Sequence, residues 1–225
     1  MNTSTLVHNR ISIRTMRRIS SLLSILLLGG ALVLTGCDST GVSGDDGEDD
    51  APLTMTRVEN LPGDPDTTSG GGYPQGHNQF AFFSLRDSSV VLHSDEQART
   101  DSASTMWDLA FRGTDIIVNG GPNGPGQGAA YVAENAFQEV SEVTPDSLTR
   151  HAVEDWYNYN ENGNHIVRPT PGHTIVVRTA DGESYAKLRI LSYYEGAPEN
   201  PAESGAESRY YTFEYVLQDD GTRFE

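Results

Sequence analysis

The sequence predicts an all-β fold, a mostly antiparallel sheet or sandwich with one short helix. Residues 107–112 alternate apolar and polar side chains, which is the period of a strand with one buried face. Residues 174–179 and 184–192 are extended runs on either side of an Asp-Gly pair, which favours a tight hairpin turn. The clearest helix-start signal spans residues 144–146, so strands account for most of the expected structure.

The stretch at residues 107–131 organises the expected sheet. Its alternating run places Trp107, Leu109 and Phe111 on one face and Asp108, Ala110 and Arg112 on the other. Residues 116–118, Ile-Ile-Val, predict a second buried strand. Residues 119–128 then hold five glycines and two prolines, and glycine loses the most backbone freedom on folding. We expect this loop to bring backbone close to either a neighbouring strand or a ligand.

The remaining strands are expected from short β-branched and aromatic runs between turn signals. An edge strand is expected near residues 53–58, and a hairpin joins residues 80–85 to residues 90–92. Further extended pieces are expected at residues 130–133, 137–140, 165–167 and 209–217. The last of these places Tyr211, Phe213 and Tyr215 on one side.

The predicted helix begins at Thr144, whose hydroxyl suits an N-cap. Pro145 then occupies the first helical position, and Asp146 lies near the positive end of the helix. We expect this helix to run to about Val153, with a polar aromatic segment following it.

Residues 1–36 are interpreted as a lipoprotein signal peptide that leaves the mature chain. A positively charged segment opens it, formed by Arg10, Arg14, Arg17 and Arg18. The apolar run at residues 22–34 is shorter than the ~20 residues that span a bilayer. Residues 34–37, Leu-Thr-Gly-Cys, match a lipobox in which Cys37 is lipidated. The alternative is an ordinary secretory peptide with a chance cysteine.

Lipidation of Cys37, the only cysteine, leaves no thiol for a disulfide or a metal site. Residues 37–51 are acidic and glycine-rich, which predicts a flexible tether. Their acidity resembles the surface-export signals of some Gram-negative lipoproteins, and a solvated spacer is the alternative. Residues 52–225 suit a single domain. The expected location is the outer membrane, with the protein lipid-anchored at the cell surface.

The charge of the chain restricts its partners. The formal net charge is −17, and removing residues 1–36 leaves 11 basic residues against 32 acidic ones, a net charge of −21. Nucleic acids and anionic lipid surfaces need positive charge, so the sequence excludes both as partners. Lys187 is the only lysine, and this composition also resembles adaptation to high salt.

Three blocks of sequence resemble the HmuY-like family of secreted, haem-binding lipoproteins. They are WDLAF at residues 107–111 with IIVNGG at 116–121, VVRTADGESYAKLRILSYY at 176–194, and YYTFEYVL at 210–217. The resemblance covers roughly residues 80–217. It implies a β domain that captures haem as a bound ligand for iron acquisition and passes it to an outer-membrane haem receptor.

Histidines are the candidate haem ligands, because haem needs one or two axial ligands and an apolar slot. The most plausible set is His151, near the end of the predicted helix, with His165 and His173, which flank a proline-containing loop. For each of them a surface histidine is the alternative. The resemblance implies variable ligation, and a Met-Met site would have to use Met55 and Met106, of which Met106 is expected in the core.

Enzyme templates are not matched, so no catalytic residues are predicted. The glycine loop lacks the Gly-Lys-Ser/Thr of a phosphate-binding loop, and neither G-x-S-x-G nor H-E-x-x-H occurs. The acidic run at residues 45–50 lacks the ligand spacing of a calcium loop, so no metal beyond haem iron is expected.

Two functions from different classes remain. The first is haem capture without turnover. The second is a structural, glycan-binding or protein-binding surface module that has lost haem binding. Exposed aromatic residues would suit sugar stacking, the candidates being Trp156, Tyr157, Tyr159, Tyr193 and Tyr194. Two histidines facing one flat cleft would favour the first function, and histidines on separate faces would favour the second.

Overall fold

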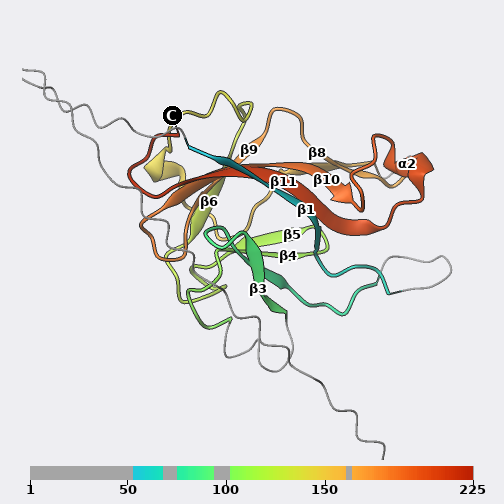
Figure 1. Ribbon diagram of the computed structural model, residues 1–225, viewed down its shortest axis with the longest axis horizontal. Helices are drawn as coiled ribbons and strands as arrows, with labels where there is room; N and C mark the ends of the chain where they lie inside the picture. Colours follow the sequence, from blue (N-terminus) through green and yellow to red (C-terminus); the bar gives the residue numbers. More distant parts are fainter. Residues whose placement is uncertain (1–52, 68–74, 94–101, 161–163, 225) are drawn as a thin grey trace, which may run out of the picture. The chain divides into compact units, whose positions relative to one another are not determined.

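The computed structural model describes residues 53–67, 75–93, 102–160 and 164–224, all within one unit that spans Asp49–Glu225. These residues form mostly antiparallel β-sheets with little helix, so the predicted fold class is confirmed (Figure 1). The predicted signal peptide, lipidated Cys37 and acidic tether lie outside the described residues. Within the described residues, no helix is both long enough and apolar enough to cross a membrane.

The larger sheet has five antiparallel strands in the order β1-β11-β10-β9-β6. The strands are β1 (Met55–Pro62), β6 (Ala129–Ala133), β9 (Thr174–Arg178), β10 (Tyr185–Tyr194) and β11 (Ser208–Gln218). The predicted β9–β10 hairpin is confirmed, and its Gly182 has a φ of +82°. β1 takes the predicted edge position, and β11 is an interior strand between β1 and β10.

The smaller sheet has four strands in the order β3-β2-β4-β5. They are β2 (Ala81–Ser84), β3 (Ser89–His93), β4 (Leu109–Arg112) and β5 (Asp115–Val118). The predicted hairpin of residues 80–85 and 90–92 is therefore confirmed, and the two strands predicted at residues 107–112 and 116–118 pair with each other. A separate two-stranded ribbon consists of β7 (Tyr157–Tyr159) and β8 (Val167–Pro169).

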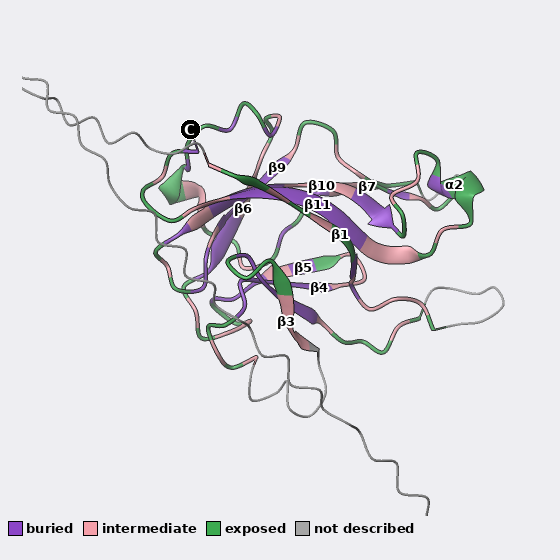
Figure 2. Cartoon of the chain, viewed as in Figure 1, coloured by how far each residue is buried: buried purple, intermediate pink, exposed green. Residues whose placement is uncertain are grey.

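Figure 2 shows buried stretches on the strands of the two larger sheets, and aromatic rings from these strands meet in the main core. The Phe83 and Phe213 ring centroids are 5.5 Å apart, and Phe111 lies 4.9 Å from Tyr211 and 5.6 Å from Phe213. These edge-to-face, tilted and stacked pairs add to the stabilisation from burying apolar area. The predicted apolar face of β11 is thus the face that contacts the smaller sheet.

The opposite face of the larger sheet is covered around Lys187. This side chain is buried, its Nζ donates to the main-chain oxygen of Val140 at 2.7 Å, and the ammonium lies 4.9 Å from the Phe137 ring centroid and 5.3 Å from that of Phe224. Burial lowers the pKa of Lys187, because the charged form loses its hydration. The only lysine of the chain therefore holds two loops against the sheet.

The predicted helix at residues 144–153 is wrong in extent. Only a single 3-10 turn forms, at Pro145–Ser147, and the side chain of Thr144 makes no capping hydrogen bond. The following residues instead pair with the sheets, because Arg150 N–H donates to Ala130 O and Val153 N–H donates to Ile116 O. Pairing with two strands satisfies the backbone groups that a helix would have used.

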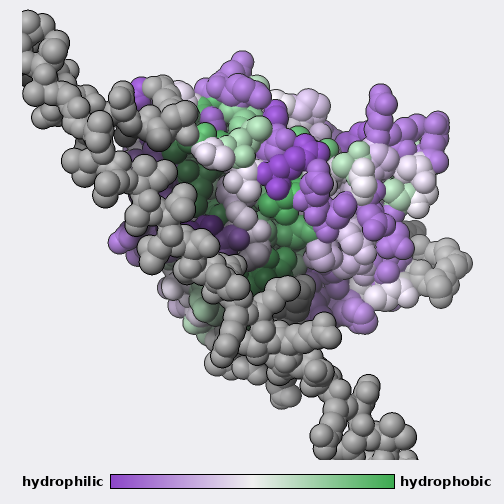
Figure 3. Space-filling view, in the orientation of Figure 1, coloured by the Kyte–Doolittle hydropathy of each residue, from purple (hydrophilic) through white to green (hydrophobic). Residues whose placement is uncertain are grey.

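Two smaller expectations also differ from the structure. Residues 137–140 form a turn rather than a strand, with Glu139 N–H donating to Ala136 O. The loop between β10 and β11 contains a short helix, α2 (Pro201–Ser204), which ends at Gly205 with a φ of +67°. The face seen in Figure 3 carries mainly hydrophilic side chains, in keeping with the acidic composition.

Candidate functional site

The glycine loop at residues 119–128 closes against protein backbone, not around an open site. Gln127 N–H donates to Ala180 O at 2.8 Å, and Gly128 N–H donates to Asn119 O at 2.8 Å. A Cβ at Gly126 would lie 2.6 Å from Asn119 O and 2.8 Å from Ala180 O. The loop backbone thus closely approaches backbone just beyond the ends of β5 and β9, as expected of a loop this rich in glycine.

Asn119 and Asp108 hold this end of the domain together. The buried Asn119 amide donates to Ser104 O and Trp107 O, and its Oδ1 accepts from Gly126 N–H. The Asp108 carboxylate accepts from the main-chain N–H groups of Leu85 and Ala180, both at 2.9 Å. Burial raises the pKa of Asp108, although these two N–H groups act in the opposite direction.

His151 belongs to this closed end. Its Nδ1 lies 3.2 Å from Gly128 O, and its ring covers Gly121, where an added Cβ would lie 2.5 Å from Nε2. His151 therefore packs on the glycine loop.

His165 and His173 lie at opposite ends of the β7–β8 ribbon. His165 is exposed near the ribbon tip, with Nδ1 2.9 Å from the Tyr159 hydroxyl. His173 lies beyond the base, with Nδ1 2.9 Å from the main-chain oxygen of Asp155, just before β7. Asp155 and Tyr159, which make these contacts, are four residues apart along an extended segment, or about 13 Å at about 3.3 Å per residue. The structure therefore does not bring the three predicted histidines together, and their role in haem ligation stays a prediction.

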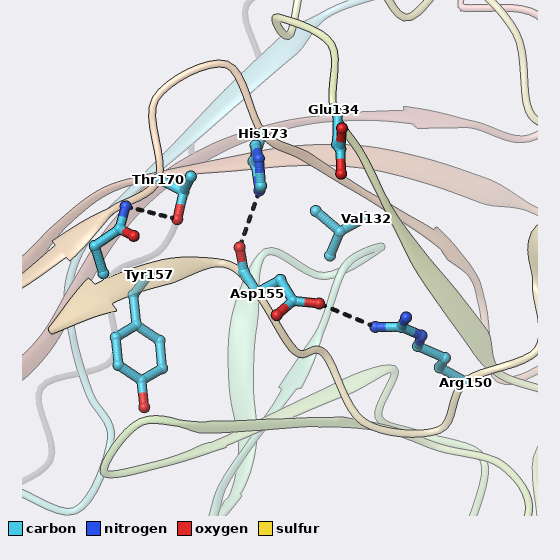
Figure 4. A pocket seen from close by; sticks show the side chains of 8 residues that line it. Val132, Glu134, Arg150, Asp155, Tyr157, Thr170 and His173 are labelled. Atoms are coloured by element: carbon cyan, nitrogen blue, oxygen red, sulfur yellow. Dashed lines mark hydrogen bonds and ion pairs between the residues drawn. The ribbon is translucent and has the colours of Figure 1, made fainter.

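His173 lines a pocket of about 360 Å³ beside the base of the ribbon (Figure 4). Val132 and Glu134 on and after β6, Arg150, and Asp155 contribute to the same pocket. Arg150 lies 3.4 Å from the carboxylates of both Glu154 and Asp155. The lining is mainly polar, with Val132 as its aliphatic wall.

Two further polar residues complete this pocket beside Tyr157. Asn158 Nδ2 donates to Thr170 Oγ1 at 3.1 Å, which ties β7 to the turn that carries His173. Asp155 has a φ of +61°, a conformation that non-glycine residues rarely adopt. Its main-chain oxygen is thereby aimed at His173 (Figure 4).

Most of the aromatic residues considered for sugar stacking are in the core. Trp156, Tyr193 and Tyr194 are 2%, 5% and 6% exposed, whereas Tyr159 is 46% exposed. Trp156 Nε1 donates to Thr114 O, and the Tyr194 hydroxyl accepts from Val167 N–H. Met55 and Met106 are about half exposed, so the expectation that Met106 lies in the core is wrong.

Sequence reasoning did not identify the residues around His173. Glu134, Arg150 with Asp155, and Thr170 come from three separate segments without a shared motif, so no local spacing could have found them together. Within the described residues, no group of three or more His, Cys, Asp or Glu side chains is arranged to hold a metal ion. No protein-family model matches the chain, and no curated protein matches it either.

Proposed function

We propose that this domain is the ligand-binding part of a lipid-anchored outer-membrane protein that captures haem without turnover. In this proposal, haem is bound as cargo at the His173 pocket, and the iron is then passed on through an outer-membrane receptor. The proposal is supported by the three sequence blocks that resemble haem-binding lipoproteins. The observation that carries it in this chain is the hydrogen bond of His173.

The hydrogen bond of His173 prepares one nitrogen for a metal. A carbonyl oxygen only accepts, so His173 Nδ1 must carry the proton that it shares with Asp155 O. In the neutral ring, Nε2 then has a free lone pair. Histidines that bind metals almost always donate their other ring N–H to a carbonyl or carboxylate in this way. His151 also contacts a carbonyl through Nδ1, but its ring packs on the glycine loop. His173 lines a pocket and is therefore the preferred axial ligand among the three predicted histidines.

Arg150 supplies a positive charge in the same pocket. Haem carries two carboxylates, which a guanidinium can bind through charge-assisted hydrogen bonds. Arg150 is held only by contacts of 3.4 Å and its side chain is 47% exposed, so it can reorient toward a ligand at little cost. His173 and Arg150 would then contact the iron and the periphery of the same haem.

A haemin titration of the mature chain with Cys37→Ser, followed by visible absorption, tests this proposal. We expect a Soret band that saturates at one haem per chain. His173→Ala should weaken binding at least about tenfold, the ~1.4 kcal/mol expected for loss of one ligand contact. His165→Ala is the matched control, because His165 is an exposed histidine on the same ribbon. A spectrum that does not saturate, or that is indifferent to His173→Ala, would contradict the proposal.

The second candidate function is a structural, glycan-binding or protein-binding surface module. Two observations favour it: the three histidines occupy separate segments, and the lining of the His173 pocket is mainly polar. A saturable complex with a saccharide or protein, in a chain that does not bind haemin, would select this function.

A further inference from the structure

A second pocket, of about 410 Å³, lies where three connections meet. They are the segment after β1, the β4–β5 turn at Gly113-Thr114, and the start of β11 at Arg209. The volume is within the range of small-molecule sites, ~300–1,000 Å³. This pocket shares none of its lining residues with the His173 pocket.

The walls of this pocket are held rigidly by main-chain contacts. Gly63 N–H donates to Arg209 O, and Gly113 N–H donates to Gly63 O, both at 2.8 Å. The buried Tyr211 hydroxyl donates to Gly113 O at 2.7 Å, and Trp156 Nε1 donates to Thr114 O at 3.0 Å. A site held by rigid elements and buried side chains is prepared for a ligand before binding.

Two guanidinium groups of a chain poor in basic residues line this one pocket. Arg112 stacks over the Phe80 ring with its Cζ 4.3 Å from the centroid, and its Nη2 contacts Asp115 Oδ2 at 2.7 Å. Arg209 Nη1 donates to Asp64 O at 3.0 Å and lies 3.6 Å from Asp64 Oδ2. Each guanidinium is thus oriented by an aspartate beside it, and the charges within the pocket balance.

Unusual backbone conformations gather around the same pocket. Asp64, Asn78 and Arg209 have φ values of +63°, +59° and +69°. Asp and Asn tolerate this conformation, but it is uncommon for a residue such as arginine. Backbone strain of this kind is most often found at functional sites, where the surrounding structure maintains it.

We propose that this pocket binds a neutral saccharide unit. A sugar hydroxyl both donates and accepts hydrogen bonds, so it suits a lining in which donors alternate with acceptors. Arg112 and Asp115 provide such an adjacent pair, and Thr114, Gln75 and Asn78 add groups of both kinds.

The same lining disfavours the other ligands of this size. A phosphate or carboxylate would meet the Asp64 and Asp115 carboxylates, and the repulsion would offset its attraction to the two arginines. A porphyrin needs a broad apolar surface, and the described residues that line this pocket include no aromatic side chain. A neutral sugar hydroxyl group can accept a hydrogen bond from an arginine and donate one to an aspartate, so it is stabilised by both charges.

Isothermal titration of the mature Cys37→Ser chain with glucose, galactose, mannose and N-acetylglucosamine tests this site. We expect millimolar, saturable binding of at least one sugar. Arg112→Gln and Asp115→Asn should each weaken that binding about tenfold or more, because each removes one charge of the Arg112–Asp115 pair and with it the charge-assisted hydrogen bond to the sugar. Arg86→Gln is the matched control, since Arg86 is likewise an arginine paired with aspartate carboxylates but does not line this pocket.

Thermal melting of each variant establishes that it is folded. No saturable binding of any of the four sugars would overturn the proposal, as would binding that is equal in the two pocket variants and the native chain. The same sugar titrations are repeated with the His173→Ala variant, so that failure of the saccharide site can be distinguished from failure of haem capture. The saccharide site should be unchanged there, whether or not the native chain binds haemin.

Discussion

The glycine loop at residues 119–128 and the β8–β9 turn at residues 170–173 both contain glycine and proline, yet they differ in what surrounds them. The first packs against protein atoms: Asn119 Oδ1 accepts from Gly126 N–H, the His151 ring contacts Gly128 O, and neighbouring atoms fill the space beside Gly126. The second turn lies between two pockets, and His173 lines both. In the glycine loop, polar groups of the protein hydrogen-bond one another and so stabilise the fold. Beside the β8–β9 turn, polar side chains line two pockets in which a ligand can bind.

Replacement of Asn119 should give the largest loss of stability. Asn119→Ala leaves Gly126 N–H, Ser104 O and Trp107 O without their partner, and unsatisfied buried groups cost about 1–3 kcal/mol each. We expect about 3 kcal/mol or more in urea unfolding. Asn158→Ala, which removes one exposed hydrogen bond near the turn, should cost under about 0.5 kcal/mol. Equal effects would break the contrast between the two regions.

Glycine replacements should separate the two regions more directly. Gly126→Ala places a Cβ within 2.8 Å of two main-chain oxygens, and we expect it to cost about 2–3 kcal/mol in urea unfolding. Gly172→Ala meets no atom within 4 Å but must keep a φ of +75°, so its cost should be about 1 kcal/mol. A larger effect at Gly172 would show that the turn is as tightly constrained as the loop.

The stability that Asp108 contributes, beside the glycine loop, should depend on pH. Because burial raises the pKa of Asp108, the stability that it contributes is fully present below the ordinary aspartate pKa and is lost as the pH rises through the raised value. Asp108→Asn should therefore cost about 1–2 kcal/mol near pH 4, and the difference should shrink toward pH 8. Urea unfolding across this range is the measurement.

Glu214 is the control for that experiment, because its contribution to stability should change with pH in the opposite direction. Burial would raise its pKa, but hydrogen bonds from Arg189 and Arg57 outweigh burial and lower it. The stability it contributes is present above the ordinary glutamate pKa and is lost as the pH falls. The cost of Glu214→Gln should therefore shrink toward acid pH. A difference for Asp108→Asn that follows the same direction would contradict the assignment of Asp108.

The smallest expected effect concerns Asp155 at the pocket. Asp155→Gly removes the positive-φ strain but keeps the main-chain oxygen that accepts from His173. Stability should stay within about 0.5 kcal/mol of the native chain or rise slightly, because glycine adopts this conformation without strain. Haemin affinity should change less than it does in His173→Ala. A loss as large as that of His173→Ala would instead assign the ligand contact to the Asp155 carboxylate.

Much of the fold could be predicted because it depends on local patterns. Alternation identified β4 and β11, and the Asp-Gly pair identified the β9–β10 turn. The sequence alone could not show that the helix predicted at residues 144–153 is only one turn long. Its start signals are genuine, but Arg150 and Ala152 form β-bridges with Ala130 and Ile117 instead of continuing a helix. That competition depends on which strands lie nearby.

The candidate site was predicted only in part. His173 could be singled out as a residue type able to bind iron, but its tautomer depends on Asp155 O, and its pocket depends on segments as distant as Glu134 and Arg150. The second pocket was not predicted, since Arg112 and Arg209 are almost a hundred residues apart.

The sequence by itself determined the strands, the tight turns and the strongly acidic charge, because each follows from the spacing or composition of neighbouring residues. The tertiary structure alone decided that the glycine loop is closed by protein atoms, that Lys187 is buried, and that the three histidines lie apart. The physical reason is that hydrogen bonds and close contacts depend on distance in space, and sheet pairing brings together residues that are far apart in the chain.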